Sequence, residues 1–310
     1  MSVLRILLRR VALGVAAAWG ILTAIFALFT LTDDWVVGAK IGRLRWGGAG
    51  ESEVEAARQA YLSARGLDRP LHEVYIDWMT NMATLEWGQS FESGDQVFPM
   101  VADATMRTAS YVLPALVLAI AIGLAVGLYA ALNPGSRLAG LGLGSTYLLF
   151  AVPNFWLGGM LAALATAGTI PATPVVFDYL LPITLTATTL LGGYVSYTRA
   201  YSAEFVSTDF VRLVRAKGAS KLRVGKHVIR NAAIPVFSML FTEALALLLL
   251  TVFVIERLFG IEGFGTVLLA AVGNRDIPVL LGSTVVITAV GVLGTILQDL
   301  SYSVLDPRVD

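Results

Sequence analysis

The stretch Ala244-Leu-Ala-Leu-Leu-Leu-Leu-Thr-Val-Phe-Val-Ile255 decides the fold class, because it carries no charge and no alternation of polar and apolar residues. Strands of a membrane barrel alternate between lipid-facing and lumen-facing residues, whereas spanning helices form long apolar runs. The whole chain is apolar: 56% of its 310 residues are hydrophobic and 14% are charged, with a mean hydropathy of +0.74. Soluble domains carry about 25% charged residues. The sequence therefore predicts an all-α polytopic membrane protein.

Six segments are long and apolar enough to cross a membrane. A spanning helix needs about 20 predominantly apolar residues, because the hydrocarbon core is about 30 Å thick. The predicted spans are Val11 to Leu31, Tyr111 to Leu132, Leu141 to Ala165, Tyr179 to Tyr201, Ala232 to Ile255 and Val279 to Leu305.

Basic residues predict the orientation in the cytoplasmic membrane. Arg5, Arg9 and Arg10 precede the first span, which is longer than the 7 to 15 apolar residues of a signal peptide, so we expect an uncleaved anchor. Residues 199–230 hold eight Lys/Arg against two acids. By the positive-inside rule, both termini and the segment 204–230 are predicted to be cytoplasmic.

The one sizeable polar insert follows the first span. Residues 33–103 carry six Lys/Arg against twelve acids, which favours an external subdomain between the first two spans. Within the insert, residues 51–64 have helix-forming composition, and Ser52 with Glu55 could form a capping box. The predicted organisation is residues 1–32 as N-terminal segment and first span, 33–105 as external subdomain, and 106–310 as a core with five spans.

Composition and motifs argue against most enzymes. The chain has no cysteine, and His72 and His227 are too few and too far apart for a metal site. No G-x-x-x-x-G-K-[ST], H-E-x-x-H or G-x-S-x-G string occurs, so the chain has no phosphate-binding loop of its own and no protease or lipase motif. A net charge of zero gives no reason to expect nucleic acid as a partner.

The segment 204–230 is too polar to span and too patterned for a simple linker. Phe210, Leu213, Val214 and Lys217 follow helical spacing, and Gly218 permits a sharp turn, so two short helices joined at the glycine are predicted. Two interpretations remain open. The segment is either a basic amphipathic loop on anionic lipid headgroups or a docking element for a cytoplasmic partner.

Several strings in this sequence are similar to ABC importer permeases of the dipeptide/oligopeptide/nickel family. Asp209 to Gly218, followed by Arg230-Asn-Ala-Ala-Ile-Pro235, resembles the EAA-loop region of these permeases. Further matching strings are spread over most of the chain in the family's order: Gly66-Leu-Asp-Arg-Pro-Leu71, Val152-Pro-Asn-Phe-Trp-Leu-Gly158, Val254-Ile-Glu-Arg-Leu-Phe259, Gly263-Phe-Gly265, Arg275-Asp276-Ile-Pro278 and Leu305-Asp-Pro-Arg308.

The resemblance implies a permease subunit that forms half of a pore. Its partners would be a second, homologous permease, two cytoplasmic ATPase subunits and an external solute-binding protein. ATP would be used by the ATPase subunits, with no cofactor held by this chain. The implied ATPase-coupling residues are Asp209, Phe210, Arg212, Leu213, Arg215, Ala216, Lys217 and Gly218. Di- or oligopeptides are the expected substrates, with nickel, glutathione and sugars as alternatives within the family.

Candidates for the transport pathway come from the spans. Glu243 is an ionisable group at membrane depth, which is costly unless it faces a cavity or a partner. Phe155 and Trp156 could line a cavity, although packing or interface roles are commoner for such residues. Glu256 and Arg257 are expected at a solvated helix end. The alternatives from other classes are a proton-coupled secondary transporter that uses Glu243, and a membrane anchor or sensor.

Overall fold

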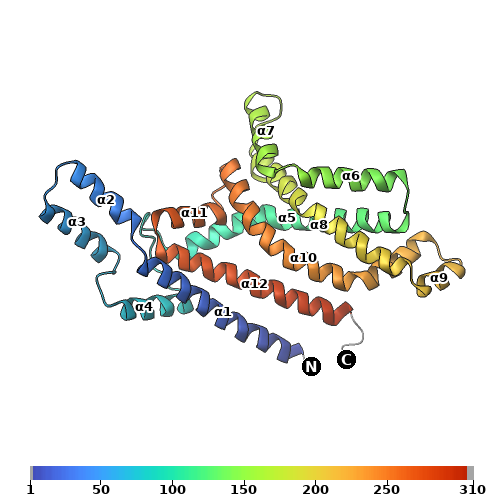
Figure 1. The fold of residues 1–310 in the computed structure, drawn as a ribbon, viewed down its shortest axis with the longest axis horizontal. Coiled ribbons are helices and arrows are strands. Elements are labelled where there is room, and N and C mark those ends of the chain that lie inside the picture. The colour runs from blue at the N-terminus through green and yellow to red at the C-terminus, as the bar shows by residue number, and fades with distance from the viewer. Residues whose placement is uncertain (1–2, 306–310) are drawn as a thin grey trace. The chain divides into compact units, whose positions relative to one another are not determined.

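The computed structural model describes residues 3–305, and within them the side chains of residues 7–230, 232 and 250–299. Over this range the regular elements are helices, with a single isolated β-bridge between Gln89 and Gln96, which confirms the all-α class (Figure 1). The elements are α1 (Val3–Leu31), α2 (Trp35–Trp46), α3 (Glu51–Ala64), α4 (Leu71–Thr84), α5 (Val97–Leu132), α6 (Arg137–Ala151), α7 (Asn154–Thr166), η1 (Val175–Leu180), α8 (Leu181–Val206), α9 (Asp209–Ala216), α10 (Lys221–Phe259), α11 (Phe264–Asn274) and α12 (Ile277–Leu305).

Four of the six predicted spans correspond to helical segments that are long and apolar enough to cross a membrane. These segments are Leu7–Trp46, Val97–Leu132, Val175–Val206 and Ile277–Asp299. The predicted fifth span, 232–255, lies within α10, where the side chains of 233–249 are outside the described part of the structure.

The predicted third span, Leu141 to Ala165, is not one straight helix. It consists of α6 and α7, which meet at an angle of 86°. The cause is local: Pro153 has no backbone N–H to donate, and it holds Val152 in an extended conformation with φ −77° and ψ 122°. Such a bend is typical of a broken span or a re-entrant segment.

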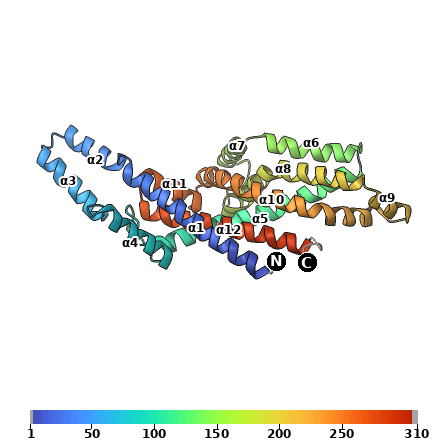
Figure 2. The same ribbon diagram turned by 60° about the horizontal axis from the view of Figure 1, so that its bottom comes forward.

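The chain divides into two compact units. The core unit is residues 106–265 with both ends of the chain, and the insert unit is residues 8–105 with 266–292. Within the core unit, α8 is central, because it packs against α6, α7 and α10 (Figures 1 and 2).

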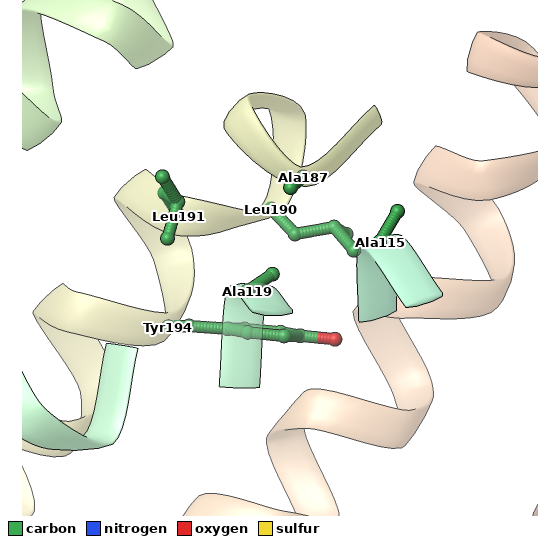
Figure 3. Packing of buried hydrophobic residues seen from close by; sticks show 6 residues of the cluster. All are labelled: Ala115, Ala119, Ala187, Leu190, Leu191 and Tyr194. Atoms are coloured by element: carbon green, nitrogen blue, oxygen red, sulfur yellow. The ribbon is translucent and has the colours of Figure 1, made fainter. Parts of the chain in front are cut away.

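A stripe of small residues lets α5 pack closely against α8. Ala115, Ala119, Gly123 and Gly127 recur every four residues and so lie on one face of α5. The two alanines form one buried cluster with Ala187, Leu190, Leu191 and Tyr194 of α8, and Figure 3 shows Leu190 and Tyr194 extending toward them. A Cβ added at Gly127 would lie 2.6 Å from Cβ of Thr198 and 2.8 Å from the carbonyl oxygen of Val195. The two backbones therefore approach as in small-xxx-small helix pairs of membrane proteins.

The insert unit is organised around the start of α2. One carboxylate oxygen of Asp34 accepts from the backbone N–H of Val36 and Val37, at 2.9 and 3.1 Å, and so caps α2. The other accepts from the hydroxyl of Tyr61 on α3, at 2.9 Å. Burial and this contact with the carboxylate raise the pKa of Tyr61 to about 12. The predicted helix 51–64 is confirmed, but its N-cap is Gly50, so the capping box predicted from Ser52 and Glu55 is wrong.

Arg275 and Asp276, between α11 and α12, hold this unit together. The buried guanidinium of Arg275 lies 3.4 Å from the Asp34 carboxylate and donates to the carbonyls of Phe29, Thr32 and Asp33 at the end of α1. The buried carboxylate of Asp276 accepts a 2.5 Å hydrogen bond from Ser90. The sequence identified this dipeptide as part of a family string without a role; the structure gives both residues a role in joining distant segments.

Candidate coupling site

Helix α9 is the short helix predicted within the segment 204–230. Asp209 occupies its first turn and Arg215 its last, so both charges complement the helix dipole. Asp209 also forms an ion pair with Arg212 at 3.2 Å, but both side chains are largely exposed, so this pair contributes little stability. The position of α9 must therefore be fixed by its apolar contacts.

One face of α9 is anchored in the core unit. Val211, with 2% of its surface exposed, packs with Val224 and Val228 of α10. Val214 of α9 and Leu132 of α5 pack against the same cluster. Burial of these side chains removes apolar surface from water and holds α9 against the first turns of α10.

The opposite face of α9 leaves apolar side chains uncovered. Phe210 is 50% exposed and Leu213 is 55% exposed, although both are large apolar residues on a polar segment. Phe210 keeps one edge-on ring contact with His227, at 5.8 Å between centroids. Arg212, Arg215, Ala216 and Lys217 are exposed around them. This combination of exposed apolar side chains and cations is typical of a protein-docking surface.

The turn predicted at Gly218 is confirmed. Gly218 adopts φ +77°, a left-handed conformation that disfavours residues with a Cβ, and its N–H donates to the carbonyl of Arg215 at 2.9 Å. Ser220 then caps α10 by accepting from the N–H of Arg223. The prediction of a second short helix is wrong, because α10 is 39 residues long and includes the predicted fifth span.

Of the pathway candidates, the structure describes the side chains of Phe155 and Trp156. Phe155 and Trp156 lie at the start of α7 and are 62% and 56% exposed, so the described residues of the core unit do not enclose them. Their neighbour Asn154 fixes α7 on α8 by donating to the carbonyl of Leu185 at 2.8 Å. The side chain of Glu243 lies outside the described residues.

Glu256 is completely buried, contrary to the expected solvated helix end, while Arg257 is exposed. The carboxylate accepts from the hydroxyls of Thr108, at 2.5 Å, and Tyr111, at 3.2 Å. A Cβ at Gly263 would collide with it. The signal that could have revealed this burial is Gly263-Phe-Gly265, whose glycines leave room for the carboxylate. Glu256 therefore ties the end of α10 to α5.

Taken together, several apolar helices long enough to cross a membrane and a short amphipathic helix on a basic segment define a polytopic membrane protein. The family model described as binding-protein-dependent transport system inner membrane component matches residues 123–310. The chain is 29% identical to the oligopeptide transport system permease protein AppB of Bacillus subtilis, over 83% of this chain and 86% of that protein. It is 31% identical to a putative peptide permease protein of Brucella ovis over 99% of both chains. It is 27% identical to the dipeptide transport system permease protein DppB of Escherichia coli, over 84% and 88%.

The chain belongs to the family of inner membrane components of binding-protein-dependent transport systems. It is a multi-pass membrane protein similar to dipeptide and oligopeptide permeases, and its family role is that of an ABC importer permease subunit, a transport component rather than an enzyme.

Proposed function

We propose that this chain forms half of the translocation pathway of an ATP-driven importer of di- or oligopeptides. It pairs with a homologous permease, receives substrate from an external solute-binding protein and docks two cytoplasmic ATPase subunits. The observation that carries the coupling role is the two-sided character of α9, with Val211 buried and Phe210 and Leu213 exposed.

The coupling mechanism follows from how α9 is held. An ATPase that covers Phe210 and Leu213 would bind the exposed face of α9. On the buried face, Val211 and Val214 pack α9 against α10 and α5. ATP binding changes the ATPase conformation, and the permease state that fits it better becomes populated. Alternating access then requires that the ATPase binds α9 more strongly in one permease state than in the other. Burial of the exposed apolar face of α9 can supply this difference in binding free energy.

The peptide substrate is supported by the relatives. The Bacillus subtilis, Brucella ovis and Escherichia coli proteins are named as oligopeptide, peptide and dipeptide permeases. Nickel, glutathione and sugars are the other substrate classes to test, since no residue of the described core unit distinguishes them.

The test is uptake in vesicles that contain the complete transporter. A labelled dipeptide, added with the solute-binding protein of the transporter, should accumulate only with ATP inside the vesicles. Nickel, glutathione and a disaccharide serve as comparison solutes. Accumulation by the chain alone under a proton gradient would instead support the secondary transporter that uses Glu243.

The pathway residues have their own test within the same vesicles. Glu243→Gln keeps size and hydrogen bonding but removes the charge, so it should slow peptide uptake and leave basal ATP hydrolysis unchanged. Wild-type uptake by this variant would make Glu243 a structural residue. Alanine at Phe155 and Trp156 should slow uptake only if these exposed side chains face the pathway when the partner permease is bound.

A further inference from the structure

A basic groove lies between the end of α5 and the first turns of α10. Its volume is about 900 Å³, and residues within 125–133 and 220–229 line it. Ala125, Leu128 and Leu132 of α5 form an apolar wall, and Leu222 and Ile229 of α10 extend it. Leu222 is 87% exposed, so the groove opens beside an apolar side chain that the described residues of the core unit leave uncovered.

Three cations line the same groove. Lys221, Arg223 and Lys226 are all exposed, and no acidic side chain is among the lining residues. In the described part of the chain, no ion pair joins any of the three to a carboxylate. Lys221 instead donates to the neutral side chain of Asn133 at 3.1 Å, which holds its ammonium at the end of α5. The positive end of the α10 dipole adds to this field.

The groove therefore needs a ligand with an apolar part and an anionic part. It lies where the apolar helix α5 ends, which is where a span meets the membrane interface. Basic pockets between helices at that depth suit anionic lipid headgroups, with the acyl chain along the apolar wall. A soluble anion would bind only to the cations and would leave the apolar wall exposed to water.

We propose that the basic groove binds one anionic phospholipid, with its phosphate at Lys221, Arg223 and Lys226 and an acyl chain against Ala125, Leu128 and Leu132. This assignment divides the basic segment between two partners. The first turns of α10 hold lipid, while α9 remains available for the ATPase. The lipid site is independent of which solute is transported.

The test is lipid binding to the full-length chain, purified in detergent with the subunits that accompany it. Native mass spectrometry should show one phosphatidylglycerol bound at least tenfold more tightly than phosphatidylcholine with the same acyl chains. Changing Lys221, Arg223 and Lys226 to Gln should abolish this preference, since each cation near an anionic surface contributes about fivefold. The matched control is the same change at Lys40, Arg43 and Arg45 of α2, which should keep it.

A second variant tests the apolar wall without changing charge. Ala125→Trp fills the groove and should weaken phosphatidylglycerol binding at least fivefold, whereas Ala121→Trp, one turn earlier on α5, should not. Equal affinity for the two lipids, or an unchanged preference in the triple variant, would overturn the proposal. So would competition by millimolar inorganic phosphate, which would indicate a free-anion site.

A protein occupant gives a different result. Because the chain has no cysteine, Leu222→Cys can carry a single photoreactive thiol reagent. Crosslinking to phospholipid in the assembled transporter supports the lipid site. Crosslinking to another subunit would show that the groove is a protein interface and would overturn the proposal.

Discussion

The two faces of α9 should respond differently to truncation. Leu213 is 55% exposed, so about half of its surface remains available for an ATPase to bury. Full burial of a leucine contributes about 1.5–3 kcal/mol, so Leu213→Ala should weaken ATPase binding by about 0.75–1.5 kcal/mol, or roughly threefold to tenfold. The stability of the permease itself should change little.

Val211→Ala should do the reverse in the permease. Val211 is 2% exposed, and the change removes two carbon atoms from a packed cluster. At about 0.8 kcal/mol per carbon plus a cavity cost, the expected loss of stability is about 2 kcal/mol. ATPase binding would then suffer indirectly, because α9 is less firmly held.

The assay is titration of the ATPase subunit onto detergent-solubilised permease, with thermal unfolding of the same samples. Leu180→Ala is the matched control, since Leu180 is 53% exposed and lies at the start of α8, whereas α9 follows the end of α8. Undiminished ATPase affinity in Leu213→Ala, or an equal loss in the control, would show that the exposed face of α9 is not a docking surface.

Three further predictions concern topology and packing. An impermeant thiol reagent on intact cells should label Ser63→Cys but not Ser220→Cys; the opposite pattern would reverse the assigned orientation. Gly127→Leu should destabilise the core unit by at least about 1–3 kcal/mol, because no side chain fits against α8, while Gly144→Leu, with open space around it, should be tolerated in the same unfolding assay. Arg275→Gln leaves the carboxylate of Asp34, which is 16% exposed, without its cation, so a loss of about 3–5 kcal/mol and rapid proteolysis between α1 and α2 are expected; unchanged protease resistance would contradict the role of Arg275 in joining these segments.

The helical class could be predicted because long apolar runs have few alternative structures in a membrane. The bounds of α3 and the turn at Gly218 were also predictable, since composition and a single glycine determine them locally. The break between α6 and α7 carried a local signal in Val152-Pro153, but the apolar run on both sides of it favours one continuous helix.

Near Glu256 in sequence, only the glycines of Gly263-Phe-Gly265 signal its burial, and they do not identify the groups that bind its carboxylate. Those groups are the hydroxyls of Thr108 and Tyr111, nearly 150 residues earlier in the chain. The same holds for α9, whose helical spacing was visible, but whose buried and exposed faces depend on which side α10 occupies. Tertiary contacts of this kind leave no periodic pattern, so sequence reasoning identifies the segment and not its partners.

The stripe of Ala115, Ala119, Gly123 and Gly127 has a mechanical consequence. Side chains that interdigitate between helices can change rotamer and absorb a sliding motion, but at Gly123 and Gly127 almost no such layer separates α5 from α8. The pair should therefore behave as a single stiff beam. Because α9 follows directly from the end of α8, a displacement of α9 would move α8 and α5 together. The parts of the core unit that bend must then lie elsewhere, for example at the 86° bend between α6 and α7.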